Sequence, residues 1–172
     1  MKLGTSAVVH LASNLSFKPD PNEVIPEVLA GVDNILEATT TEPKVKRFVF
    51  TSSSLAAVSP VPDVKFDIDE NSWNEECIKE AWAPGPYESP REWSVYGASK
   101  TQAEQAVWKF AKEKKPHFEV NTVLPNANFG PILSPDNQPA STAAWVTDAY
   151  TKGVKDLLFL PPRTFSQSRS AF

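Results

Sequence analysis

The sequence predicts an α/β protein built on a parallel β-sheet. Short apolar runs typical of buried strands occur at residues 7–11, 45–50 and 118–124. Segments with the spacing of amphipathic helices lie between and beyond these runs. Strands and helices that alternate in this way indicate a parallel sheet joined by right-handed crossovers.

The first half of the chain predicts a strand, a helix and a second strand. After the strand at 7–11, residues 14–22 contain two prolines and are expected to form a loop. Across residues 23–39 the apolar side chains recur at helical spacing. Pro26 is expected in the first turn of that helix, where a proline costs little. The β-rich run at 45–50 then gives the second strand.

The middle of the chain predicts a long loop followed by a long helix and a third strand. Residues 59–90 are rich in proline, polar and aromatic residues and have little periodicity, with room for one short helix at 73–82. An amphipathic helix is expected over 96–115, and Pro116 ends it. The strand at 118–124 follows.

Two further elements are expected near the C-terminal end. Ser141 or Thr142 can cap a helix that runs to about Lys152, and Gly153 lies where a helix commonly stops. Residues 157–160 are a candidate for a short strand. The sequence contains no internal repeats.

Composition and charge exclude several classes of function. The formal net charge is −4 and no basic cluster is longer than residues 112–115, so nucleic-acid binding has no support. Cys77 is the single cysteine and the two histidines are far apart, so we expect no intramolecular disulfide and no metal site. No apolar run is long enough to span a bilayer or to form a signal-peptide core, and a cytoplasmic location is expected.

Tyr96 and Lys100 form the most informative pair of residues in the sequence. They stand four residues apart at the head of the predicted long helix, and residues at this spacing share one helix face. A nearby cation can lower the pKa of a phenol from about 10. A tyrosine in that setting can pass a proton to or from an alcohol oxygen. The pair alone is weak evidence, but it follows a strand that ends in a threonine and three serines at 51–54.

Candidate binding residues follow each predicted strand. In open α/β sheets the ligand lies at the carboxyl ends of the strands. We therefore expect three segments to converge at one edge, namely Ala12-Ser13, residues 51–54 and Pro125-Asn126. His10 is interpreted as a packing residue at the end of its strand. Trp108 and Phe110 are interpreted as core residues, while Trp93 suits either packing or ligand contact.

The chain resembles the extended short-chain dehydrogenases/reductases of the NAD-dependent epimerase/dehydratase superfamily. Within it, the chain is similar to the dihydroflavonol-reductase-like branch, in particular to fungal NADPH-dependent aldehyde reductases and ketoreductases. The resemblance rests on residues 8–13, 45–53, 96–104, 108–110 and 116–131. It implies a partial Rossmann-type doubly wound parallel sheet, which lacks the first βαβ unit and most of the substrate domain.

The resemblance also implies the roles of the site residues. Ser53 corresponds to the catalytic serine, although Ser54 leaves the register open by one position. Tyr96 corresponds to the general acid/base and Lys100 to its cationic partner, and both also contact the cofactor. The other residues implied at the cofactor are Ala12, Ser13, Pro125 and Asn126. The implied cofactor is NADP(H) or NAD(H), and the implied partner is a small carbonyl or alcohol substrate.

The resemblance further implies a division of the chain. Residues 1–133 correspond to the C-terminal part of a dinucleotide-binding domain, and within them 59–92 form a loop on the substrate side. Residues 134–162 begin the substrate-binding region. Residues 163–172 form a Ser- and Arg-containing tail that departs from the family.

One departure from the family concerns the cofactor phosphates. The family opens with a Gly-x-Gly-x-x-Gly turn that holds the pyrophosphate, and this sequence contains no such motif. We therefore expect the chain to begin at the fourth strand of the family and to stop short of the substrate domain. The strand at 7–11 would then be an open sheet edge, which predicts a marginally stable domain prone to self-association.

Three functions remain open on the sequence alone. The first is reduction of aldehydes or ketones, or oxidation of the matching alcohols, with NADP(H). The second is a sugar-nucleotide epimerase or dehydratase, which is disfavoured as a dehydratase because no carboxylate follows Ser53 in residues 54–57. The third is a catalytically incompetent homologue that only binds or packs, which the missing glycine motif favours.

Overall fold

The structure is a computed structural model that describes residues 4–59, 61, 63–130, 134, 136, 142 and 144–153, and the backbone of 167–170. The described elements alternate between strands and helices, as predicted. In chain order they are β1 (Ala7–His10), α1 (Pro21–Thr40), β2 (Arg47–Thr51), the short 3-10 helix η1 (Ser54–Ala56), α2 (Glu75–Ala81), α3 (Arg91–Lys114), β3 (Glu119–Leu124), α4 (Ala144–Lys152) and β4 (Gln167–Ser170).

The sheet has the order β1-β2-β3-β4, and its first three strands are parallel. In the register of these strands Val9 pairs with Val49, and Thr51 pairs with Val123. This confirms the predicted parallel α/β class. β4 runs antiparallel to β3 and was not predicted, because its sequence lacks the β-branched and aromatic residues that favour strands. The candidate strand at 157–160 lies outside the described residues.

Two helices begin earlier than the apolar periodicity indicates. α1 begins at Pro21, because the Asp20 side chain accepts a hydrogen bond from the Asn22 amide and caps the helix. α3 begins at Arg91 rather than at residue 96. Tertiary contacts hold its polar first turn, where the Arg91 guanidinium donates to the Ala83 carbonyl oxygen at 2.7 Å.

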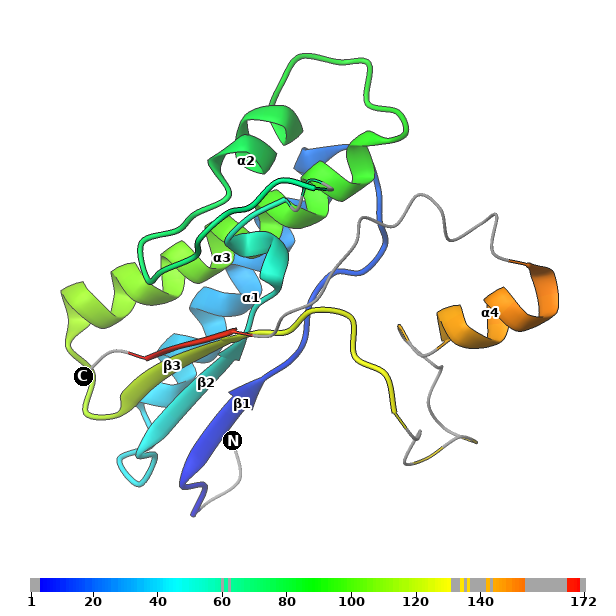
Figure 1. Cartoon of the computed structure of the whole chain (residues 1–172). Coiled ribbons are helices and arrows are strands. Elements are labelled where there is room, and N and C mark those ends of the chain that lie inside the picture. Colours follow the sequence, from blue (N-terminus) through cyan, green and yellow to red (C-terminus); the bar gives the residue numbers. More distant parts are fainter. Residues whose placement is uncertain are drawn as a thin grey trace.

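The core lies between the sheet and one layer of helices. Both parallel crossovers run in the same direction along the sheet, so α1 and α3 cover the same face (Figure 1). Buried apolar side chains from both helices and from β2 and β3 meet there. They include Val24, Ile25, Val32, Leu36, Phe48, Phe50, Ala103, Val107 and Val120. Neither of these two helices covers the opposite face, where the Val9 side chain is 57% exposed.

The segment between β2 and α3 packs closely against α3. A Cβ atom added at Gly97 would lie 2.6 Å from the Cys77 sulfur, so α2 approaches α3 at a distance that only glycine allows. Buried Asn74 caps α2 by accepting from the Cys77 amide, and its Nδ2 donates to the Leu55 carbonyl oxygen at 2.8 Å. Asn74 thereby fixes η1, which directly follows the end of β2.

Candidate functional site

The segments that follow β1, β2 and β3 lie at one edge of the sheet, because the three strands are parallel. The Ser52 amide donates to the Val123 carbonyl oxygen at 2.8 Å, and the Ser54 amide donates to the Pro125 carbonyl oxygen at 2.9 Å. The turn after β2 is thus joined to the turn after β3. This is the edge at which the sequence predicts a ligand site.

Ser53 lies directly beyond β2, and it is almost completely buried. It caps η1, and its Oγ accepts a hydrogen bond from the Leu55 amide at 3.3 Å. Because Ser53 is the acceptor in this bond, its hydroxyl proton stays available for donation to another oxygen. A fixed hydroxyl of this kind suits a substrate carbonyl oxygen.

Tyr96 and Lys100 lie on the face of α3 that is directed toward the sheet. The Lys100 side chain is only 4% exposed. Its Nζ donates to the Thr51 carbonyl oxygen at 3.2 Å and lies 6.0 Å from the centroid of the Tyr96 ring. A cation held near a phenol stabilises the phenolate form. The helix pair predicted from its spacing is therefore joined to the end of β2.

The charge on Lys100 is strongly influenced by its surroundings. Burial lowers the pKa of Lys100 to about 8, while the negative charge of Glu104 acts in the opposite direction. The Phe50 ring lies 5.8 Å from the Lys100 Nζ. His10 stacks on Phe50 with 5.9 Å between ring centroids, and its pKa is lowered by burial and then by the charge of Lys100.

An aromatic cluster borders the tyrosine. Phe17 stacks on Tyr96 with 5.3 Å between ring centroids, and it tilts against Trp93 at 5.1 Å. The Phe17 side chain is 41% exposed, so its ring is open to a ligand as well as to these two residues. Sequence reasoning missed Phe17, because no local pattern indicates which residue of the 14–22 loop folds back onto α3. Trp93, which the sequence left open, packs in this cluster.

The residues predicted to hold the cofactor differ in their setting. The Ser13 Oγ is buried and has no hydrogen-bond partner among the described residues, which is unusual for a buried hydroxyl. Ala12 is exposed, and Pro125 and Asn126 are half-buried. The Asn126 side chain accepts from the Ala127 amide at 2.8 Å and so shapes the turn after β3.

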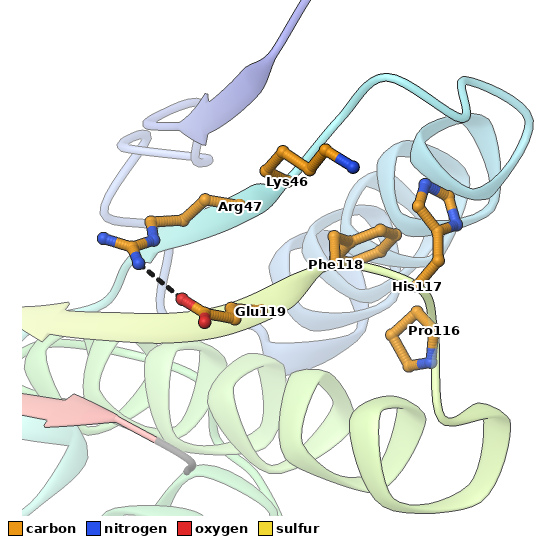
Figure 2. Close-up of a pocket in the computed structure, with 6 residues that line it drawn as sticks. All are labelled: Lys46, Arg47, Pro116, His117, Phe118 and Glu119. Carbon is orange, nitrogen blue, oxygen red and sulfur yellow. Dashed lines mark hydrogen bonds and ion pairs between the residues drawn. The ribbon is translucent and has the colours of Figure 1, made fainter.

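A hollow of about 480 Å³ lies at the opposite end of the strands and is not part of this site. It is lined by Lys46, Arg47, Pro116, His117, Phe118 and Glu119, and Arg47 and Glu119 form an ion pair in it (Figure 2). None of the predicted site residues lines this hollow.

Neither a metal-binding cluster nor a membrane-spanning helix occurs in the part of the chain that the structure describes. Within it, no group of three or more His, Cys, Asp or Glu side chains is arranged to hold a metal ion. No helix in the same residues has the length and apolar character needed to cross a membrane. The cytoplasmic location expected from the sequence stays a prediction.

A parallel α/β sheet with serine, tyrosine and lysine at its carboxyl edge is the arrangement of an extended short-chain dehydrogenase/reductase. The chain belongs to the NAD dependent epimerase/dehydratase family, whose sequence model matches residues 1–169. This confirms the resemblance inferred from the motifs.

Two curated fungal proteins show the same relationship. The chain is 46% identical over 149 residues to NAD-dependent epimerase/dehydratase terH of Aspergillus terreus. This alignment covers 87% of this chain and 44% of that protein. It is 42% identical over 160 residues to aldehyde reductase 2 of Sporidiobolus salmonicolor. That alignment covers 92% of this chain and 47% of the relative. The chain therefore spans a little under half the length of these relatives.

A solved structure supports the fold. The yeast methylglyoxal/isovaleraldehyde reductase Gre2 complexed with NADPH superposes with a TM-score of 0.65 at 27% sequence identity. The match covers 83% of this chain and 43% of Gre2. The Rossmann-like α/β fold predicted from the resemblance is thus confirmed for the part of the relatives that this chain represents.

Proposed function

We propose that this chain carries the catalytic segment of an NADP(H)-dependent reductase of aldehydes or ketones, which also oxidises the matching alcohols. The observation that carries the proposal is the position of Lys100, whose buried ammonium joins the Tyr96 ring to the end of β2. Similarity to an aldehyde reductase and to an NADPH-complexed reductase supports the same chemistry.

Each of the three residues has a separate role in this proposal. Tyr96 donates its phenolic proton to the substrate oxygen during reduction and takes it back during oxidation. Lys100 stabilises the resulting phenolate through its positive charge. Ser53 donates a hydrogen bond to the same substrate oxygen, which orients the carbonyl group and stabilises the charge that develops on it.

The residues at the sheet edge fit a nicotinamide cofactor in one respect. The buried Ser13 hydroxyl lacks a partner among the described residues, and a ligand with many polar groups would satisfy it. Ser13, Ala12 and the Pro125-Asn126 turn would hold the cofactor, and Lys100 would bind its ribose hydroxyls. The bound cofactor would supply the hydride.

The substrate in this proposal is a small and fairly apolar carbonyl compound. Phe17, Trp93 and Tyr96 present aromatic surface next to the reacting phenol, and the Phe17 ring is partly exposed. An apolar surface beside one fixed hydrogen-bond donor is typical of small-molecule sites.

A second candidate function is a homologue that no longer catalyses and acts only through binding or packing. The observation behind it concerns residues 1–172 alone, which contain no Gly-x-Gly-x-x-Gly turn to hold the cofactor phosphates. Charge-assisted hydrogen bonds to a pyrophosphate contribute about 1.5–3 kcal/mol each, so without them the affinity for a dinucleotide would fall by orders of magnitude.

Titration of the chain with NADPH separates the two candidates. We expect heat of binding in calorimetry, a thermal shift, and oxidation of NADPH when small aldehydes or ketones are added. Tyr96→Phe is the matched control, because it keeps the ring that stacks on Phe17 and removes only the acid. It should bind NADPH and lose turnover. The absence of heat and of a thermal shift at millimolar NADPH would leave the non-catalytic candidate.

A further inference from the structure

A fully buried carboxylate lies one helical turn beyond Lys100. Glu104 has no exposed surface, and its position four residues after Lys100 places it on the same face of α3. Its Oε1 accepts hydrogen bonds from the Thr122 hydroxyl of β3 at 2.8 Å and from the Trp108 indole nitrogen at 3.3 Å. Burial of a charged carboxylate is costly unless it is paired, and the roles proposed above give Glu104 no part.

The surroundings of Lys100 explain what Glu104 can contribute. β1 brings His10 toward Lys100, and β2 brings the Phe50 ring and the Thr51 carbonyl oxygen. Tyr96 lies on α3 one turn before Lys100, with its ring centroid 6.0 Å from the Lys100 Nζ, and Glu104 lies one turn after it. Glu104 is the acidic group that acts on Lys100 in this set, and it opposes the effect of burial on the charge.

We propose that Glu104 is a positioning residue whose buried negative charge stabilises the protonated form of Lys100, which lies one helical turn before it on α3. Thr122 and Trp108 orient the carboxylate through its Oε1 atom. The importance of Glu104 for catalysis rests on the proposed reductase function, whereas the effect of its charge on Lys100 can be measured without it.

Glu104→Gln tests the role of the charge. The glutamine keeps a carbonyl oxygen that can accept from Thr122 and Trp108, so this variant removes the negative charge and preserves the hydrogen bonds. The titration of Lys100 is followed through its Cε resonance in lysine-labelled protein, without cofactor or substrate, and Lys100→Met assigns the signal. We expect the midpoint to fall by about one pH unit or more, a tenfold change in the protonation equilibrium. A midpoint within about 0.3 pH units of the wild-type value would overturn the proposal.

Thr122→Val is the matched control. It removes the hydroxyl that donates to the Glu104 carboxylate at 2.8 Å but leaves the charge in place. Its Lys100 midpoint should move by much less than that of Glu104→Gln. Equal changes in the two variants would mean that local packing, rather than charge, sets the titration, and the proposal would be wrong.

A measurement on the wild-type protein covers the case in which Glu104→Gln does not fold. The side-chain carboxyl resonance of Glu104 should change with the same midpoint as the Lys100 resonance, because the carboxylate senses the loss of the neighbouring charge. A Glu104 resonance that stays constant through the Lys100 titration would contradict an interaction between the two charges.

The pH profile of turnover tests the catalytic consequence. If the chain reduces a carbonyl compound, the alkaline limb of the Glu104→Gln profile should move down by the same amount as the Lys100 midpoint. If the Lys100 midpoint changed in Glu104→Gln while the alkaline limb of the turnover profile did not, the role of Glu104 in catalysis would be overturned. If the chain shows no turnover, the reductase proposal fails, while the titration of the free protein still decides whether Glu104 holds the charge of Lys100.

Discussion

The Nζ of Lys100 donates a hydrogen bond to the carbonyl oxygen of Thr51 at 3.2 Å, which ties the third turn of α3 to the last residue of β2. Two residues beyond Thr51 the chain reaches Ser53. One ammonium group therefore fixes the position of the helix that carries Tyr96 relative to the strand that leads to the serine.

Lys100→Met should change the pH dependence of stability in a defined direction. The pKa of Lys100 is lowered to about 8 in the folded chain, against 10.5 in the absence of burial. Between these values the unfolded chain binds the proton more tightly, so the free energy of unfolding rises with pH. Relative to Lys100→Met, the wild-type protein should gain on the order of 1–3 kcal/mol between pH 7 and pH 10.

Urea unfolding of both proteins at the two pH values measures this gain. Lys109→Met is the matched control, because Lys109 is exposed on the same helix. It should unfold with the same pH dependence as the wild-type protein. Parallel pH curves for wild type and Lys100→Met would show that burial does not disfavour the charge of Lys100.

Gly97→Ala should destabilise the protein. The added methyl group would lie 2.6 Å from the Cys77 sulfur and 3.1 Å from its Cβ, which forces α2 and α3 apart. Overpacking of this kind costs about 1–3 kcal/mol. Cys77→Ala in the same chain removes the sulfur and should recover part of the loss in thermal melts.

Gly31→Ala is the control for the glycine substitution. A Cβ atom at Gly31 meets nothing within 4 Å, and the residue is exposed in α1. Here alanine should stabilise the helix by roughly 0.5–1 kcal/mol. If both variants raised the melting temperature, the close contact between α2 and α3 would be refuted.

Asn74→Ala should loosen the turn that carries Ser53. The substitution removes the cap of α2 and leaves the buried Leu55 carbonyl oxygen without its donor. Together these losses should cost about 2–3 kcal/mol in the free energy of unfolding. Hydrogen exchange should also become faster at the Leu55 amide, which bonds to the Ser53 hydroxyl. Asn71→Ala, at an exposed position, should stay within about 0.5 kcal/mol of the wild-type protein.

Val9→Lys should reduce self-association. β1 pairs with β2 alone among the described strands, and Val9 exposes most of its side chain beside that edge. A lysine on an edge strand opposes pairing with another chain. Sedimentation velocity across a concentration series should show less association than for the wild-type protein. Val146→Lys, at a valine of similar exposure on α4, should have no such effect. If both variants associated to the same extent, the surface that mediates self-association would not be the β1 edge.

Much of this architecture could be predicted from periodicity and turn chemistry. The three parallel strands and the helices α1 and α3 follow from their apolar spacing, and α4 follows from the cap candidates before it and the glycine after it. The first turn of α3 could not be predicted, because polar contacts such as that of Arg91 with Ala83 hold it. β4 is set by pairing with β3 rather than by its own composition.

The site was predictable to the extent that its residues are close in sequence. Tyr96 and Lys100 follow from helical spacing, and the same spacing points to Glu104 once its burial is known. Phe17 reaches Tyr96 from a distant loop, and its contact depends on the backbone conformation of that loop, including a positive φ of 49° at Phe17 itself. No sequence pattern within the loop predicts that Phe17 contacts Tyr96.

The connection between β2, the turn that carries Ser53 and α3 has a consequence for protein engineering. Thr51, Ser53, Tyr96, Lys100 and Glu104 all lie within one continuous stretch that runs from β2 to α3. Exchange of this stretch between members of the family should therefore transfer these five residues with their mutual spacing intact. Under the proposed function, the recipient scaffold would supply the remaining surfaces that select the substrate and hold the cofactor.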